Sequence, residues 1–321
     1  NLAICLHRLG NQISGSDDLF FDPSKSNLER EGLLPDTAGW HPERVDNSLD
    51  YVILGMHAKA DNPELLKAQA LNLPIYSFPE FIYQASKDKK RVVIAGSHGK
   101  TSITSIIMHV LKAAKKDFDY LVGAQLHGFD QMVRLSNAPV IIIEGDEYTT
   151  SPLDPTPKFL HYHHDIACIS GIAWDHFNVF PTFNSYVEQF QKFVELTPEN
   201  GKLYYYKGDP ELSSIIDDQK DENNRETENL ILQVETLRNE NANLNTELNE
   251  RLNSVSTVDF DQQSVEDVKL VLDEKVKEIK ALNEELLNKQ KHIDRLKVSL
   301  TDILRKNDDL NKARAFYWCC E

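Results

Sequence analysis

Residues 92–102 read Val92-Val93-Ile94-Ala95-Gly96-Ser97-His98-Gly99-Lys100-Thr101-Ser102, and this stretch decides the fold. The first four residues are apolar or β-branched, which predicts a short buried strand. A turn with two glycines follows at once, and the apolar spacing of residues 103–114 predicts a helix behind it. A strand that turns through glycines into a helix is typical of a parallel α/β sheet.

The turn at 96–102 offers the groups that bind a polyphosphate. Backbone N–H groups converge at the start of a helix, glycines allow close approach, Lys100 can neutralise β- and γ-phosphates, and Thr101 carries a hydroxyl for Mg²⁺. The segment departs from the generic P-loop, since Ile94 stands where that motif has glycine. We therefore expect ATP and Mg²⁺ to bind through Gly96, Ser97, His98, Gly99, Lys100, Thr101 and Ser102.

Three acids, Glu144, Asp146 and Glu147, follow the apolar run 141–143. Because the carboxyl ends of parallel strands line the ligand crevice, these carboxylates would face the phosphates and could hold Mg²⁺. A solvated acidic turn is the alternative interpretation.

A third motif, Gly171 to Asn178, follows the strand predicted at 166–170. His176 within it could bind a metal or act as a general base, whereas a structural histidine beside aromatic residues is the alternative.

Residues 1–88 predict a Rossmann-like domain, because short apolar strands alternate with helices. Asn62-Pro63-Glu64 begins one helix, with proline in the first turn where its missing N–H costs little. The other predicted elements are a helix from residue 2 and strands at 12–17, 51–55 and 73–77.

Residues 89–215 predict part of a P-loop-type central domain with a parallel sheet, and the basic stretch 87–91 separates it from the first domain. The alternation of strands and helices fades after residues 204–206. The remaining predicted elements are buried strands at 120–123, 140–143 and 166–170, and a helix at 185–196 with Tyr186, Phe190 and Phe193 at helical spacing.

Residues 216–321 predict an α-helical coiled coil. All 13 glycines and all 13 prolines lie at or before Pro210, and the sequence beyond is rich in Glu, Lys, Asn and Leu. Apolar residues then repeat at heptad positions a and d. The first block has Val234, Asn241 and Leu248 at a and Leu230, Leu237 and Leu244 at d; the second has residues 265, 272, 279, 286, 293, 300 and 307 at a.

The two heptad registers do not join, so we expect a hinge or helix reversal near 254–264. Asn307 at an a position either fixes register or is a tolerated polar defect. We expect the coiled coil to bind a partner or to self-associate through 225–312. The final residues 316–320 are either a hydrophobic docking tip or the end of a fragment, and we favour the second interpretation.

Charge and composition bound the remaining functions. The formal net charge of −16 argues against a general nucleic-acid binder, which needs clustered Lys and Arg. Four cysteines at irregular spacing predict neither a disulfide framework nor a zinc site. With no apolar run of bilayer length, we expect no membrane partner and a cytoplasmic location.

Together and in this order, the three motifs resemble the Mur ligase family of peptidoglycan synthesis. They read Gly-Ser-His-Gly-Lys-Thr-Ser at 96–102, Glu-Gly-Asp-Glu-Tyr at 144–148, and Trp-Asp-His-Phe-Asn-Val-Phe-Pro-Thr at 174–182. Within the family they are most similar to the branch that joins UDP-N-acetylmuramate to L-alanyl-γ-D-glutamyl-meso-diaminopimelate in peptidoglycan recycling. The branch that adds L-alanine to UDP-N-acetylmuramate is the alternative.

The resemblance implies roles for individual residues. Lys100 would neutralise the β/γ-phosphates, Thr101 would hold one Mg²⁺, Glu144 would be a metal ligand at the ATP site, and His176 would bind a second metal. Lys100, Glu144 and His176 would thus form the catalytic set. The resemblance places the uridine side of the substrate at Ser14, Ser16, Asp17 and His57.

The family reaction transfers the γ-phosphate of ATP to the muramyl carboxylate, and a peptide amine then attacks the acyl phosphate. The family fold has three domains, of which this sequence matches parts of two, so we expect this chain alone to ligate nothing. A function of a different class is an interaction or scaffold protein that acts through its coiled coil, with the ligase part as a fusion relic or artefact.

Overall fold

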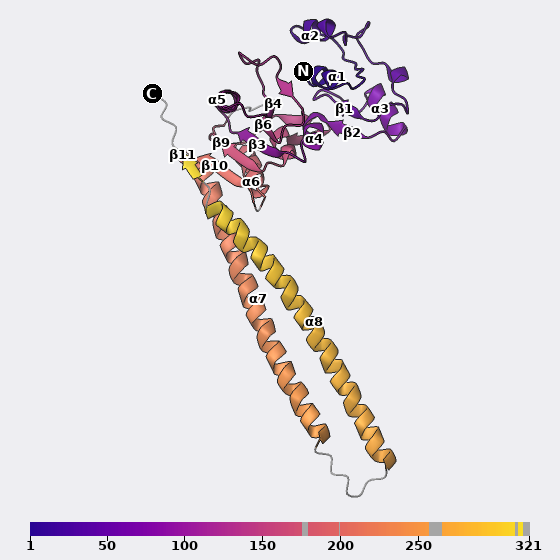
Figure 1. Cartoon of the computed structure of the whole chain (residues 1–321), viewed down its shortest axis with the longest axis vertical. Coiled ribbons are helices and arrows are strands. Elements are labelled where there is room, and N and C mark those ends of the chain that lie inside the picture. The colour runs from indigo at the N-terminus through magenta and orange to yellow at the C-terminus, as the bar shows by residue number, and fades with distance from the viewer. Residues whose placement is uncertain (175–178, 199, 257–264, 312–313, 317–321) are drawn as a thin grey trace. The chain divides into compact units, whose positions relative to one another are not determined.

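The fold is described from a computed structural model, which covers residues 1–174, 179–198, 200–256, 265–311 and 314–316. The chain divides into two compact units (Figure 1). One unit contains residues 1–217 together with strand β11 (Arg314–Phe316), and the other contains residues 218–311. Each unit is described by itself.

The first 88 residues form a small α/β part around two parallel strands, β1 (Val52–Leu54) and β2 (Ile75–Ser77). Helix α3 (Pro63–Ala70) connects them, and the Asn62 side chain caps it by accepting from the backbone N–H groups of Glu64 and Leu65. The helix expected near the amino terminus is α1 (Leu2–Arg8). The other elements of this part are α2 (Ser24–Arg30), the 3₁₀ turn η1 (Pro42–Arg44) and α4 (Phe78–Gln84).

The strand predicted at 12–17 is wrong. Those residues form no strand, and Asp17 makes one isolated antiparallel bridge to Gly39. Ser14, Gly15 and Ser16 bring neither apolar area nor β-branched side chains, so an extended pairing has little to stabilise it.

Seven strands form the main sheet, in the order β11-β10-β9-β3-β6-β4-β5. Only β5 runs antiparallel to its neighbour, β4; the other described pairs are parallel. The predicted strands are confirmed as β3 (Lys90–Ala95), β4 (Asp119–Leu121), β6 (Val140–Glu144) and β9 (Ile166–Ile169). No strand was predicted from the sequence at β5 (Val133–Arg134), β10 (Lys202–Tyr206), β11 or the antiparallel hairpin β7–β8 (Thr149–Ser151 and Asp154–Pro157).

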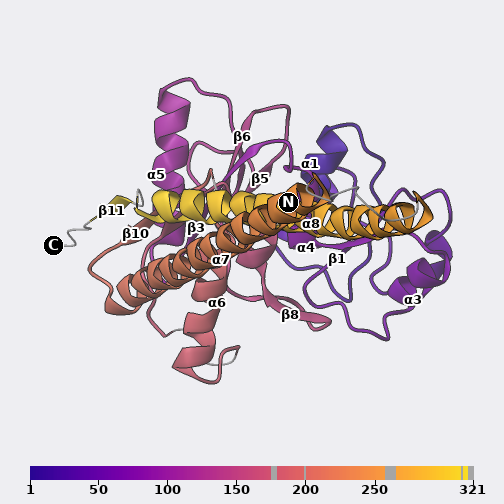
Figure 2. The same cartoon turned by 90° about the horizontal axis from the view of Figure 1, so that it is seen from below.

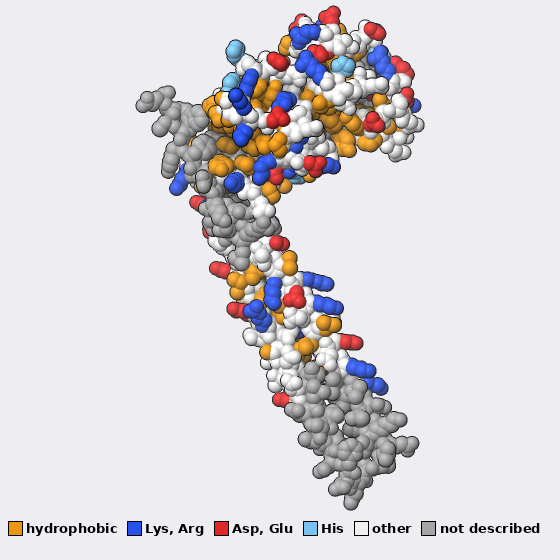
Figure 3. Space-filling model, viewed as in Figure 1, with side chains coloured by type: hydrophobic (Ala, Val, Ile, Leu, Met, Phe, Trp, Pro, Cys, Tyr) orange, Lys and Arg blue, Asp and Glu red, His pale blue; other side chains and the backbone are white. Residues whose placement is uncertain are grey.

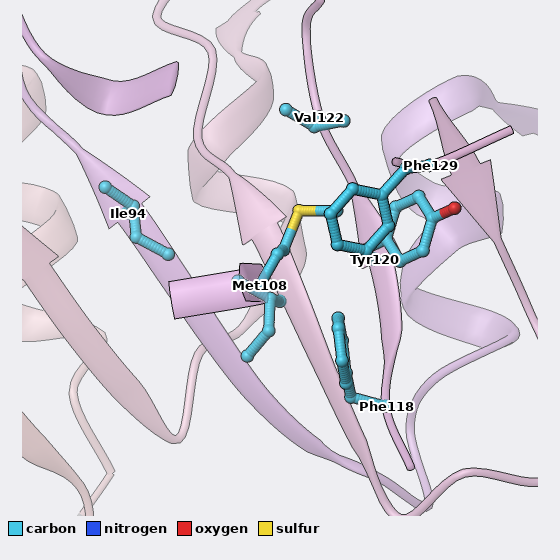
Figure 4. Packing of buried hydrophobic residues seen from close by; sticks show 7 residues of the cluster. Ile94, Met108, Phe118, Tyr120, Val122 and Phe129 are labelled. Atoms are coloured by element: carbon cyan, nitrogen blue, oxygen red, sulfur yellow. The ribbon is translucent and has the colours of Figure 1, made fainter. Parts of the chain in front are cut away.

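Helices α5 (Lys100–Ala113) and α6 (Phe183–Glu195) cover opposite faces of the sheet (Figure 2). On the α5 side, Met108 packs between Ile94 of β3 and the rings of Phe129 and Tyr120 (Figure 4). On the α6 side, the 3₁₀ turn η2 (Lys158–Tyr162) contributes Phe159, whose ring stacks on Phe190 with centroids 5.3 Å apart. Tyr186, Phe190 and Phe193 are fully buried, as their helical spacing predicted.

Two cations of the basic stretch 87–91, Lys89 and Arg91, have specific partners. Lys89 forms an ion pair with the buried Asp119 at 2.6 Å, and its ammonium also donates to the carbonyl oxygens of Ser136 and Ala138. Arg91 is buried in β3, where its guanidinium donates to the carbonyl oxygens of His163 and Ser86. These cations fasten the start of β3 to its surroundings, because each is matched by a carboxylate or by several carbonyl groups.

Residues 218–311 are a pair of long helices formed by α7 (Pro210–Ser256), which begins in the first unit, and α8 (Val265–Asn311). The two helices run in opposite directions (Figure 1), and the hinge or reversal expected near 254–264 falls largely on residues 257–264, which lie outside the described part. The a and d positions are the covered ones: Val234, Ile293 and Ile303 are buried. Lys289 lies three residues after the a position at 286 and is therefore a d position; its ammonium pairs with the Glu240 carboxylate at 2.5 Å.

Where Figure 3 colours the hairpin, basic and acidic side chains are interspersed among hydrophobic and uncharged ones. The helices are therefore amphipathic, and each covers its apolar stripe with the other. Across the described residues, no helix is both long enough and apolar enough to cross a membrane.

Candidate nucleotide-binding site

The site begins where β3 ends and the chain turns into α5. Gly96 and Gly99 both have positive φ, 121° and 79°, and Gly99 is the N-cap of α5. A Cβ at position 96 would lie 2.9 Å from the Ser170 nitrogen and 3.0 Å from the Gly171 oxygen. Glycine is thus required at 96 both for its backbone conformation and for its close approach to the neighbouring segment.

The same turn is held against the segment that follows β9. The Ser97 N–H donates to the Gly171 carbonyl at 3.0 Å, and the Ser170 hydroxyl donates to the His98 carbonyl at 2.5 Å. The N–H groups of the first turn of α5 have no partners inside the helix and point along the helix axis. That arrangement favours an anion.

Lys100 and Thr101 are the first two residues of α5, and both reach carboxylates of the acidic turn. The Lys100 ammonium donates to Glu147 at 2.8 Å and to the carbonyl oxygens of Gly96 and Ser97 at 2.7 and 3.3 Å. The Thr101 hydroxyl donates to Glu144 Oε1 at 2.7 Å. The predicted loop and the predicted acids therefore meet, through β3 and β6, which lie side by side in the sheet.

The three acids have different surroundings. Glu144 also accepts from the Gly123 N–H at 2.9 Å, and Glu147 is only 1% exposed. Asp146 turns instead to Lys158, with its carboxylate 2.7 Å from the ammonium. The alternative of a solvated acidic turn does not fit, because Glu147 is buried and all three acids have specific partners.

Burial changes the chemistry of two further groups near the sheet. Burial, together with the nearby Asp146 and Glu144 carboxylates, raises the pKa of the Tyr162 hydroxyl, so it stays protonated. Burial raises the pKa of the Cys168 thiol to about 11. Cys168 is therefore a poor nucleophile at neutral pH.

The residues present fit a magnesium nucleotide only in part. The glycine turn, an ammonium and a hydroxyl beside a carboxylate are the donor set that a phosphate with Mg²⁺ uses. Among the described residues, however, no three His, Cys, Asp or Glu side chains are grouped so that they could hold a metal ion. His176, predicted as a metal ligand and catalytic residue, lies outside the described residues.

The predicted substrate residues lie in the first 88 residues. Ser14, Asp17 and His57 are exposed, and the Ser16 hydroxyl donates to Glu64 Oε1 at 2.6 Å. Next to His57, the Met56 sulfur lies 3.9 Å from the ammonium of Lys158, the partner of Asp146. This contact links the turn after β1 to the acidic turn of the main sheet.

Several residues that shape the site were not singled out in the sequence analysis. A Cβ on Gly123 would lie 2.9 Å from Glu144 Oε1, so glycine makes room for that carboxylate. Asp209 accepts from the backbone N–H groups of Ile172 and Leu212, at 2.5 and 3.1 Å. A glycine at the end of the predicted strand 120–123 was the available signal for Gly123, whereas Asp209 gives no comparable local signal.

The chain matches known proteins over the same region. The model of the Mur ligase middle domain matches residues 94–270. The UDP-N-acetylmuramate–L-alanyl-gamma-D-glutamyl-meso-2,6-diaminoheptandioate ligase of Escherichia coli (strain K12) is 25% identical over 216 residues, 67% of this chain and 47% of that protein. The UDP-N-acetylmuramate–L-alanine ligase of Caldicellulosiruptor bescii is 32% identical over 216 residues, 67% of this chain and 45% of that protein.

Solved structures agree with these matches. The crystal structure of UDP-N-acetylmuramate:L-alanyl-gamma-D-glutamyl-meso-diaminopimelate ligase from Neisseria meningitides superposes with a TM-score of 0.61 at 26% identity, covering 68% of this chain and 70% of that chain. The murein peptide ligase from Psychrobacter arcticus gives a TM-score of 0.57 at 22% identity and supports the fold alone. The chain spans about half the length of the curated relatives that it matches. With the family model matching more than half of its residues, the chain belongs to the Mur ligase family.

Proposed function

We propose that the turn at 96–102 binds the polyphosphate of ATP with Mg²⁺ as part of an ATP-dependent, amide-forming ligase. The observation that carries the proposal is the meeting of Lys100 and Thr101 with Glu147 and Glu144 at the carboxyl ends of β3 and β6. A cation and a hydroxyl at a helix start, beside carboxylates, suit a phosphate and its metal.

In this proposal Lys100 neutralises phosphate charge, while Thr101 and Glu144 hold the metal, which would shield the phosphate oxygens during transfer. The N–H groups at the start of α5 orient the phosphates. Phosphoryl transfer depends mainly on alignment and charge shielding, which these fixed groups can supply. His176 is proposed as a second metal ligand on the family resemblance.

Calorimetric titration of the chain with Mg²⁺ and ATP tests the binding step. We expect binding by the unmodified chain and a loss of about 30-fold or more for Lys100→Ala, since charge-assisted hydrogen bonds to the phosphates would be removed. Lys112→Ala is the matched control, because Lys112 lies on the last turn of the same helix and donates to the Gly128 carbonyl. Equal affinities for the two variants and the unmodified chain would contradict the proposal.

We propose UDP-N-acetylmuramate as the carboxylate substrate and a peptide amine as the second substrate, with L-alanyl-γ-D-glutamyl-meso-diaminopimelate favoured over L-alanine. Relatives named for each reaction match the chain, so similarity alone supports both. Phosphate release with each amine discriminates between them. Release at the level of Lys100→Ala with both amines would agree with our expectation that this chain alone ligates nothing.

We place this function in the cytoplasm, where ATP is available and where the free thiols of Cys5 and Cys168 would stay reduced.

A partner for the coiled coil is a separate proposal. The expectation of a partner rested on heptads that need a second helix. Helices α7 and α8 can supply that helix to each other, since Val234 and Ile293 are buried and Lys289 of α8 pairs with Glu240 of α7. Sedimentation at micromolar concentration would give a monomer mass if this pairing is sufficient. A dimer mass would support the scaffold alternative.

A further inference from the structure

Ser97 makes contacts on both sides of the phosphate-binding turn. Its N–H donates to the Gly171 carbonyl at 3.0 Å, its hydroxyl oxygen accepts from the Ala173 N–H at 2.8 Å, and its own carbonyl accepts from Lys100 at 3.3 Å. A shift of Ser97 would therefore move the Lys100 contact and the segment at 171–173 together.

The Ser97 hydroxyl has one more partner, Tyr186 of α6. The two hydroxyl oxygens are 2.8 Å apart, and the Tyr186 side chain is fully buried. Its ring is held between Phe180 and Phe190, with centroids 5.0 and 5.2 Å away. Because the ring is packed on two sides, its hydroxyl is held in one position. A buried tyrosine hydroxyl also needs a hydrogen-bond partner, and Ser97 is one.

We propose that Tyr186 is a positioning residue for the nucleotide site: through Ser97 it sets the distance between the phosphate-binding turn and the segment at 171–173. This inference rests on the proposed function, and it assigns no contact between Tyr186 and the nucleotide. Ala173 is directly followed by Trp174 of the third motif, so the same hydroxyl pair also holds the backbone at Ala173 next to it.

The test uses Tyr186→Phe, which keeps the packed ring and removes only the hydroxyl. We expect affinity for Mg²⁺ with ATP to fall about tenfold, because the Ser97 hydroxyl loses a buried partner and the turn loosens. Tyr120→Phe is the matched control, since Tyr120 is also a buried tyrosine of the main sheet but lies in the cluster with Phe118 and Phe129. Its affinity should stay within about twofold of the unmodified chain.

A double-mutant cycle separates positioning from general destabilisation. Ser97→Ala should weaken ATP binding as much as Tyr186→Phe, and the double variant should lose no more than either single variant. Ser97→Thr, which restores a hydroxyl, should recover most of the affinity. Additive losses in the double variant would overturn the proposal.

Amide hydrogen exchange gives a readout that needs no nucleotide. In Tyr186→Phe, exchange should rise in peptides covering 96–102 and 171–174 and stay unchanged in the body of α5. If the unmodified chain binds no ATP, the proposed function fails, and the exchange result alone decides whether Tyr186 holds the turn. Unchanged exchange in both peptides would overturn the inference even if ATP binds normally.

Discussion

At the scale of single residues, the acidic turn separates three carboxylates that look alike in the sequence. Glu144 faces Thr101, Glu147 faces Lys100, and Asp146 faces Lys158. The sequence predicted that acids would meet the phosphate-binding turn, because strands that are parallel bring their carboxyl ends together. The partner of each acid depends on the direction of its side chain after β6. That direction is set by packing between elements, which cannot be read from the motif.

Glu147→Gln should have opposite effects on folding and on binding. Removing the buried negative charge leaves Lys100 without its counter-charge, so the free energy of unfolding should fall by about 2 kcal/mol. ATP should bind several-fold more tightly, since its phosphates no longer compete with a carboxylate for Lys100. Urea unfolding and calorimetry measure the two effects. Asp146→Asn is the charge-matched control, and an equal gain in ATP affinity for it would contradict the explanation.

His164 should make the stability of the protein depend on pH. Burial, with small contributions from His163 and Arg91, lowers its pKa to about 3, and its Nε2 lies 2.9 Å from the Thr197 hydroxyl. The unfolded chain, with a histidine pKa of about 6.5, therefore takes up a proton first as the pH falls. Stability should decrease below pH 6.5, by up to about 1.4 kcal/mol per pH unit. Urea unfolding at pH 7 and pH 5 measures the slope, and His164→Gln should flatten it; an unchanged slope would exclude this histidine.

At the scale of elements, the helical hairpin follows its heptads closely. Buried or half-buried side chains recur at a and d along the described part of both helices, including Val234, Ile293 and Ile303. The register mismatch predicts a hinge or a reversal between the two blocks, because one straight helix cannot keep both blocks on the same apolar stripe. The heptad repeat did not predict that the second helix would come from the same chain, because the repeat is equally compatible with a helix from a partner.

Ile293→Ala tests the hairpin core. Ile293 is 2% exposed at an a position, so the substitution should lower the free energy of unfolding of the hairpin by about 2–4 kcal/mol. Val298, on the same helix but 63% exposed, is the control, and Val298→Ala should change it by about 0.5 kcal/mol or less. Helical circular dichroism during urea unfolding reports both. Similar losses for the two variants would argue against the a/d packing.

At the scale of the whole molecule, the helical segment stands, in chain order, between two strands that are neighbours in one sheet. The chain leaves the sheet after β10, runs through α7 and α8, and returns as β11, which pairs in parallel with β10 from Tyr204 to Tyr206. Arg314–Phe316 thus belong to the sheet, and residues 317–321 lie outside the described part. Along the chain, the two helices therefore form the connection between two parallel strands.

Excision of 218–311 follows from this topology. A chain in which a Gly-Ser linker of about eight residues joins Asp217 to Lys312 should retain its α/β circular dichroism, because the main sheet has its own core. Its affinity for Mg²⁺ with ATP should stay within about twofold of the unmodified chain. Aggregation of the shortened chain, with loss of binding, would show that the helical segment is required for the sheet.

The sequence by itself determined the fold class and the local elements of the candidate site: a strand, a glycine turn and a helix, acids at the end of a second strand, and two heptad blocks whose registers do not join. Those features depend on the spacing of apolar residues and on the backbone preferences of neighbouring residues, and both can be read from the sequence. The tertiary structure alone decided the pairing of Lys100 with Glu147, the Ser97–Tyr186 contact and the return of β11 to the sheet. Each of these joins residues far apart in the chain, and packing of separate elements, rather than any local preference, brings them together.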